Sequence, residues 1–182
     1  MRNRTIALFP LLALAAFTAC ASGVPEEELK DFGKGIITDY SNMQEGEDIQ
    51  WYWIAPGTKL ADHHCTLASS ENLTTTVDHD LRDVLKEELP EVIQRACSRD
   101  ASAPPLKVDT AVYWTERANT AKAWIPFAGG HLMQAGVGME VVFKDTSGKI
   151  VAKIRQSGRE GHELKDAARE IFDDIGQFVR EH

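Results

Sequence analysis

A run of four residues, Asp62 to Cys65, collects side chains that commonly bind transition metals. His63, His64 and Cys65 are consecutive, and His79 follows further along the chain. Imidazole and thiolate groups are good ligands for Zn²⁺ or Cu²⁺. If the run lies on a strand, His63 and His64 point to opposite faces, so at most one of them can join Cys65 or His79 at a shared ion. Surface histidines explain the same pattern, and we expect no metal and no cofactor.

Two other clusters could serve hydrolysis, Ser69-Ser70-Glu71 and Asp78-His79-Asp80. A hydrolase needs a nucleophile beside a base, or paired carboxylates in a pocket. Neither arrangement is recognisable here, and helix caps, loops and a solvated first turn account for both clusters. We therefore expect a protein that is not an enzyme. The alternative is an envelope hydrolase or metal-binding protein that uses His63, His64 or His79.

The stretch from Pro126 to Gly138 has glycines near both ends and apolar residues between them. No helical pattern follows these glycines, so they do not match a dinucleotide-binding fingerprint. Such a segment can act as a mobile contact loop. Its candidate interaction residues are Phe127, His131, Leu132 and Met133. The alternative is that Leu132 and Met133 fold back onto the core.

The first twenty residues have the layout of a secretory signal. Two arginines precede the apolar run Ile6–Phe17, and the small residues Thr18 and Ala19 come directly before Cys20. As a helix the run would be roughly 18 Å long, whereas the hydrocarbon core of a bilayer is about 30 Å thick. The run is therefore too short to be a permanent anchor.

A cysteine at the expected cleavage point makes this segment resemble a lipobox, with Phe17 where that motif usually has Leu. We expect removal of residues 1–19 and covalent attachment of lipid to Cys20. Each buried methylene of an acyl chain adds roughly 0.8 kcal/mol of membrane affinity. By analogy with the sorting rule of enteric bacteria, Ala21 suggests the outer membrane, with the domain facing the periplasm. The alternative is ordinary cleavage after Ala19 or Ala21, which leaves a soluble periplasmic protein.

The charge of the chain restricts its partners. The full chain has 20 basic and 28 acidic residues, and the signal removes two of the basic ones, so the mature net charge is about −10. An acidic surface argues against nucleic acid or anionic headgroups as partners, because binding to phosphate arrays depends on basic patches. We expect the lipid on Cys20 to make the membrane contact, and the domain to bind an envelope protein or polymer.

Cys65 and Cys97 are the two remaining cysteines. An exported chain passes through an oxidising compartment, where such pairs tend to close. A bridge between them would stabilise the fold by roughly 3 to 4 kcal/mol on the chain-entropy model. We expect this disulfide, with two free buried thiols as the alternative.

The elements that position these groups follow from hydrophobic spacing. Residues 20–48 are polar and predict a lipidated N-terminus with a flexible tether. The segment Gln50–Ile54 predicts a strand that has Trp51 and Trp53 on one face and Tyr52 on the other.

The helix pattern of residues 77–97 has plausible caps at Thr76 and Asp78. Pro90 lies inside this pattern. Because proline lacks a backbone donor and clashes with the preceding turn, we expect a break at Leu89.

Alternation predicts strands over 106–115 and 121–127, and a hairpin of 137–144 and 150–155 around the turn Asp145–Gly148. The apolar stripe Leu164–Val179 predicts a second helix. The expected fold class is α+β: an antiparallel sheet of four or five strands with two helices packed on one face. We expect it to be a single domain over residues 49–182.

Three segments together resemble a group of Gram-negative exported lipoproteins catalogued as domains of unknown function. They are Trp53–Leu60, with its aromatic, Pro-Gly, short polar and Leu order; Val108–Asn119, a strand pattern followed by Arg-Ala-Asn; and Gly136–Lys149, a glycine-led strand that ends in an Asp-Thr-Ser-Gly turn. The resemblance implies a compact α+β lipoprotein domain that is an accessory of an envelope assembly. It transfers no catalytic residue, and the His63-His64-Cys65 run departs from the plain strand found in those domains.

Overall fold

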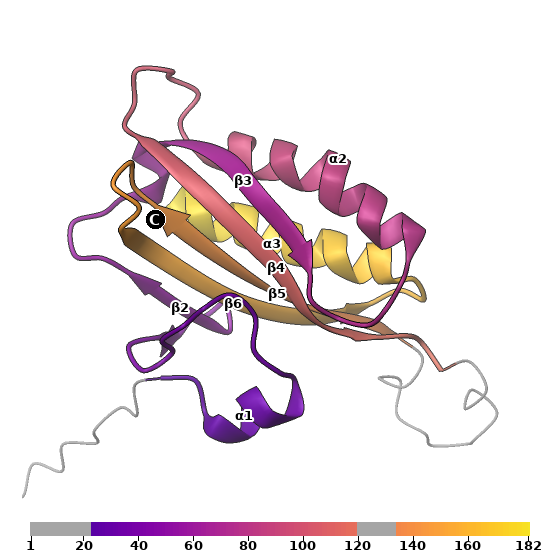
Figure 1. Cartoon of the computed structure of the whole chain (residues 1–182). Helices are drawn as coiled ribbons and strands as arrows, with labels where there is room; N and C mark the ends of the chain where they lie inside the picture. The colour runs from indigo at the N-terminus through magenta and orange to yellow at the C-terminus, as the bar shows by residue number, and fades with distance from the viewer. Residues whose placement is uncertain (1–22, 120–133) are drawn as a thin grey trace, which may run out of the picture.

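In the computed structural model, residues 23–119 and 134–182 are described, and they form one mixed β-sheet with helices packed on it (Figure 1). The elements in chain order are α1 (Glu26–Asp31), β1 (Gln44–Glu45), β2 (Trp51–Ile54), a 3₁₀ turn η1 (Leu60–Asp62), β3 (His64–Asn72), α2 (His79–Ala96), β4 (Pro105–Glu116), β5 (Ala135–Lys144), β6 (Ile150–Glu160) and α3 (Leu164–Glu181).

The sheet has six strands in the order β1-β2-β6-β5-β4-β3. Neighbouring strands are antiparallel except β3 and β4, which are parallel and connected through α2. The α+β class is confirmed, but the expectation of four or five antiparallel strands is wrong in number and in direction. The strands missed are β1, which has two residues, and β3, whose exposed Thr66, Ser70 and Glu71 hide the alternation. The strand expected over 121–127 lies outside the described residues.

The long helices α2 and α3 lie side by side on one face of the sheet (Figure 1) and share one apolar core with it. The predicted stripe of α3 is confirmed, because each of its apolar members is buried: Leu164, Ala167, Ala168, Ile171, Phe172, Ile175, Phe178 and Val179. At the start of α2, the Asp78 side chain accepts a hydrogen bond from the Leu81 amide at 3.0 Å. Asp78 is therefore the helix cap.

The break expected at Leu89 is wrong, because α2 continues through Pro90 to Ala96. Leu89 and Ile93, on either side of the proline, have no exposed surface. Full burial of each such side chain contributes about 1.5–3 kcal/mol, and a proline inside a helix costs about 3 kcal/mol relative to alanine. The free energy gained by burying Leu89 and Ile93 is thus large enough to offset the cost of Pro90 within the helix.

Residues 23–45, which we call the N-terminal strap, run along the other face of the sheet and end in its edge strand β1. The strap includes α1, which Figure 1 places across the sheet from α2 and α3. Its buried residues are Val24, Ile37, Tyr40 and Met43, and they pack with Trp51 of β2 and Val142 of β5. The described part of the segment expected to be a flexible tether, residues 23–48, is instead packed on the domain, because its apolar residues contact Trp51 of β2 and Val142 of β5.

The predicted hairpin between β5 and β6 is confirmed. Its turn is held by Asp145, whose Oδ1 accepts hydrogen bonds from the amides of Ser147 at 2.8 Å and Lys149 at 3.0 Å, and Gly148 has a φ of +84°. The loop expected to run as far as Gly138 ends earlier, because β5 already begins at Ala135.

Candidate functional site

The histidines and the cysteine considered as metal ligands are not gathered at one site. The Nδ1 atom of His63 lies 2.7 Å from the carbonyl oxygen of Lys59, and Cys65 is bonded to Cys97. Across residues 23–119 and 134–182, no three His, Cys, Asp or Glu side chains are arranged to hold a metal ion. The disulfide removes the one thiolate that the cluster would have offered.

The predicted disulfide Cys65–Cys97 is present, with a Cα–Cα distance of 5.8 Å. It joins the start of β3 to the C-cap of α2. Both cysteines are buried in the core under the helices. The bridge thus fixes one end of β3 against one end of α2.

The two clusters considered for hydrolysis make structural contacts. Ser69 donates a hydrogen bond to Asp109 Oδ1 at 2.7 Å, and Asp109 also accepts one from Lys144 at 2.7 Å. Asp78 caps α2, and Asp80 accepts a hydrogen bond from Lys165 at 3.0 Å. The carboxylates of Asp78, Asp80 and Asp109 are therefore each held by a hydrogen bond within the fold.

Four residues expected to form an interaction loop, and the cysteine expected to carry lipid, lie outside the described residues. They are Phe127, His131, Leu132, Met133 and Cys20. Their roles stay predictions.

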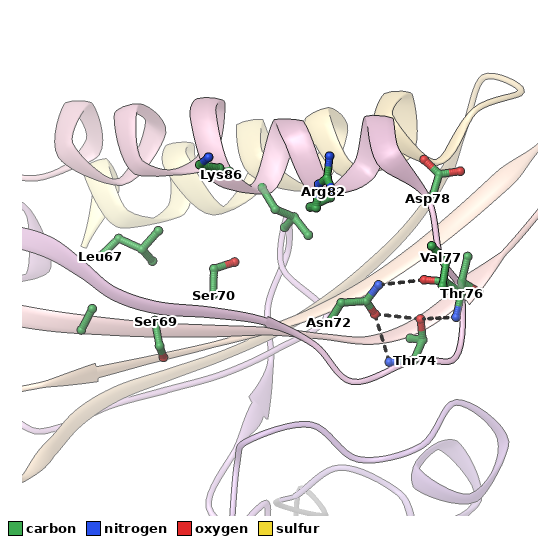
Figure 2. Close-up of a pocket in the computed structure, with 12 residues that line it drawn as sticks. Leu67, Ser69, Ser70, Asn72, Thr74, Thr76, Val77, Asp78, Arg82 and Lys86 are labelled. Atoms are coloured by element: carbon green, nitrogen blue, oxygen red, sulfur yellow. Dashed lines mark hydrogen bonds between the residues drawn. The ribbon is translucent and has the colours of Figure 1, made fainter.

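A groove between β3 and α2 is the best candidate for a functional site (Figure 2). Its volume is about 630 Å³. The lining residues are Leu67, Ala68, Ser69, Ser70, Asn72, Thr74, Thr76, Val77, Asp78, Arg82, Leu85 and Lys86. The groove opens where the second half of β3 separates from α2, beyond the end that the disulfide holds. Sequence reasoning missed it, because no periodicity reports where a helix leaves a sheet.

One end of the groove is a loop that is satisfied by its own hydrogen bonds (Figure 2). Asn72 Nδ2 donates to the Thr76 carbonyl at 3.1 Å, and Asn72 Oδ1 accepts from the Thr74 amide at 3.0 Å. The Thr74 hydroxyl in turn accepts from the Thr76 amide at 3.2 Å. These bonds order the loop before any ligand arrives, which lowers the entropy cost of binding.

Three polar side chains point into or border the groove without a strong internal partner. The side chains of Ser70 and Lys86 make no hydrogen bond or ion pair with any described residue. Among the described residues, the Arg82 guanidinium donates only to its exposed neighbour Asp83, with the shorter bond at 3.2 Å. Asp78, the acidic residue of the lining, is already held by Leu81 and by Arg117 at 3.3 Å. The groove thus offers free donors on Ser70 and Lys86, and it is lined by two cationic side chains, Arg82 and Lys86, in an acidic protein.

The backbone of β3 also faces the groove. Side chains alternate between the faces of a strand, and yet Leu67, Ala68, Ser69 and Ser70 all line this space. Figure 2 shows Ser70 directed toward α2 and Ser69 directed away from it. Four consecutive residues can line one space only if the edge of the strand faces it. The register shift between Leu67 and Ser69 lies in the same stretch. Among the described strands β3 pairs only with β4.

A second polar cluster lies between the sheet and the strap, and it is fully enclosed. Arg155 and Glu140 have no exposed surface, and Arg155 Nη1 donates to Glu140 Oε1 at 2.6 Å. Glu140 also accepts hydrogen bonds from the Tyr40 hydroxyl and the Ile37 amide, both at 2.8 Å. Burial, together with the nearby Glu140 carboxylate, raises the pKa of Tyr40. Because Glu140 is bound by Tyr40 and Ile37 of the strap, this cluster attaches the strap to the sheet.

The part of the chain that the structure describes contains no helix that is both long and apolar enough to span a bilayer.

Comparison with known proteins identifies no family. No protein-family model matches the chain, and no curated protein matches it. Solved structures of a PelC dodecamer from Paraburkholderia phytofirmans are similar to it. One has 15% identity, covers 71% of this chain and 92% of the PelC chain, and gives a TM-score of 0.41. The other has 14% identity, covers 71% and 94%, and gives a TM-score of 0.41.

Proposed function

We propose that this chain is a lipid-anchored, non-catalytic accessory protein of the cell envelope, and that its domain binds an extended segment of an envelope protein in the groove between β3 and α2. The anchor is lipid on Cys20, and the domain works on the periplasmic side of the outer membrane. The partner segment adds to the edge of β3 as a further strand.

The observation that carries the binding proposal is the edge of β3 exposed along a groove lined by a helix. An extended peptide that joins such an edge gains main-chain hydrogen bonds, while side-chain pockets next to the strand provide specificity. Here Leu67 and Leu85 offer apolar contact, and Ser70, Arg82 and Lys86 offer donors. The two cations favour a segment that carries carboxylates.

A natural sheet edge that is left open invites unwanted pairing, and proteins usually protect it. The disulfide and the hydrogen-bonded loop 72–78 fix the two ends of the groove. The groove is thereby restricted to a short stretch of β3, and only a short partner segment fits into it. This arrangement supports selective binding of one segment over general aggregation.

Photo-crosslinking in intact cells tests the proposal. A photoreactive residue at Arg82, in the groove, is compared with one at Glu91, an exposed position of α2 outside the lining. The expected result is a discrete protein adduct from position 82 alone. Hydrogen exchange of the purified pair should then show new protection of the amides of residues 67–72.

Two substitutions on β3 provide the matched control. Ser70→Trp fills the groove, whereas Glu71→Trp places the same bulk on the neighbouring exposed residue, which is not part of the lining. The adduct should disappear with Ser70→Trp and persist with Glu71→Trp. An adduct that ignores Ser70→Trp, or a carbohydrate adduct in place of a protein, contradicts the proposed mode of binding.

A further inference from the structure

The strap is ordered from its first described residue. The Gly23 amide donates to the Met43 carbonyl at 2.7 Å, and the Val24 amide donates to the Tyr40 carbonyl at 3.3 Å. Val24 is 8% exposed. The chain therefore joins the body of the domain at Gly23, far earlier than a tether that ends at residue 48 would allow.

The length of chain between the lipid and the domain follows directly. Cys20 and Gly23 are separated by three peptide units, which span at most about 11 Å when fully extended. A flexible tether over residues 20–48 would instead have a typical end-to-end distance of about 30 Å. A lipid on Cys20 thus holds the strap side of the domain within a short distance of the headgroups.

From this length we infer that the outer surface of the strap is the membrane-facing surface of the domain, and that the groove between β3 and α2 faces away from the bilayer. The inference rests on the proposed lipidation of Cys20. Figure 1 places α1, in the strap, on one side of the sheet and α2 on the other. The groove is therefore open to partners in the periplasm while the strap occupies the membrane side.

Charge decides which headgroups the strap can approach. Pro25, Glu26 and Glu27 are exposed, and the first turn of α1 is acidic. Carboxylates repel anionic headgroups but can accept hydrogen bonds from the ammonium group of a zwitterionic phospholipid such as phosphatidylethanolamine. The covalent link enforces the contact, and the net negative charge of the strap opposes binding to an anionic bilayer.

The strap can transmit this constraint because it is anchored in the sheet. Arg155 of β6 donates to the Gly33 carbonyl at 3.0 Å and lies 3.3 Å from Glu28. Lys153 of the same strand donates to the Asp39 carbonyl and to Asn42 Oδ1, both at 2.5 Å. These bonds connect the two ends of the strap to one central strand, so the sheet follows the strap.

Spin labels on the mature lipidated protein, residues 20–182, in phosphatidylethanolamine-rich vesicles test the orientation. The labels replace Glu27 of α1 and Glu87 of α2, two exposed glutamates on opposite sides of the sheet. Both labels are noncanonical residues, which leaves the disulfide intact. Nickel-chelating lipid should relax the label at 27 several-fold more than the label at 87.

A Gly/Ser spacer of about 15 residues between Ser22 and Gly23, which adds about 20 Å of reach, should remove the difference between the two labels. Equal relaxation of both labels in the lipidated protein without the spacer overturns the inference and leaves the lipid anchor standing. If intact mass shows no lipid on Cys20, the anchor itself has failed, and the inferred orientation fails with it.

Discussion

Arg155 and Glu140 lie directly opposite each other on the adjacent strands β6 and β5, and their ion pair has no exposed side-chain surface. A buried pair stabilises a fold only when its remaining donors and acceptors are also satisfied, because desolvation of two charges is costly. Here the strap supplies those partners through Ile37, Tyr40 and Gly33. The pair and the strap therefore depend on each other.

Glu140→Gln should release the strap and destabilise the domain. Among the described residues, the substitution leaves the buried Arg155 guanidinium with only the largely buried Glu28 as a charged partner, and removal of one member of a buried pair costs about 3–5 kcal/mol. Urea unfolding and proteolysis within residues 26–48 measure the two effects. Glu116→Gln, which removes the partly exposed ion pair with Arg159, is the matched control and should cost less than about 1 kcal/mol. Equal effects of the two substitutions would contradict the structural role of the buried pair.

Stability should fall at alkaline pH because two tyrosines are buried beside this pair. Burial raises the pKa of Tyr113 to about 12, and burial with the nearby Glu140 raises the pKa of Tyr40. A raised folded pKa means that the folded state holds the proton more tightly than the unfolded state. The contribution of the protonated Tyr113 to the free energy of unfolding is therefore complete below the ordinary tyrosine pKa of about 10, and it is lost as the pH rises through about 12.

Urea unfolding at increasing pH, followed with the ultraviolet absorbance of tyrosinate, checks this expectation. Tyr113→Phe serves as the control, because it should flatten part of the decline between pH values of about 10 and 12. Ionisation of Tyr113 at an ordinary pH in the folded protein is the result that contradicts the account.

Gly138→Ala should displace Tyr113 from Arg155. The Tyr113 ring lies across β5, with the Arg155 guanidinium 3.7 Å from its centre, and a Cβ at position 138 would be 2.6 Å from the ring carbon Cζ. We expect a loss of about 1–3 kcal/mol, as for other overpacked cores. In a Tyr113→Ala background the same substitution should cost much less. An equal loss of stability in both backgrounds would contradict the steric explanation.

Reduction of the disulfide should loosen the fixed end of the groove. Cys65 and Cys97 are separated by 32 residues in sequence, and closing a loop of this size contributes roughly 3 to 4 kcal/mol. Dithiothreitol should lower the free energy of unfolding by about that amount. The Cys65→Ser/Cys97→Ser protein should show the lower value with or without reductant, whereas a wild-type protein that is insensitive to reductant would refute the prediction.

The predictable part of the fold is the part where one face is apolar. Strands β4, β5 and β6 alternate, and α3 has an apolar stripe, because their apolar residues form the core between the sheet and the helices. Val141, Ile154 and Ile171 are examples. The turn at Asp145 follows local hydrogen bonding. In each case the information lies within one short segment.

The strap was missed because its partners are remote in sequence. Glu140 and Arg155 are more than 100 residues from Ile37 and Gly33. One signal for the strap was available in the sequence. Glu140 of β5 lies on the same face of the sheet as the apolar Val142, and a face exposed to solvent would not need an apolar residue at that position. The groove depends on how α2 is placed relative to β3, and a sequence pattern does not contain the relative placement of two elements.

The lipid on Cys20 is the claim on which anchoring and orientation both depend, and intact-mass analysis of the full chain extracted from Gram-negative membranes tests it most directly. We expect a chain that begins at Cys20 and is heavier than residues 20–182 by a diacylglyceryl group and a further acyl chain. We also expect that Cys20→Ser leaves the membrane fraction. An unmodified amino terminus, or a Cys20→Ser protein that stays equally membrane-bound, would contradict the account.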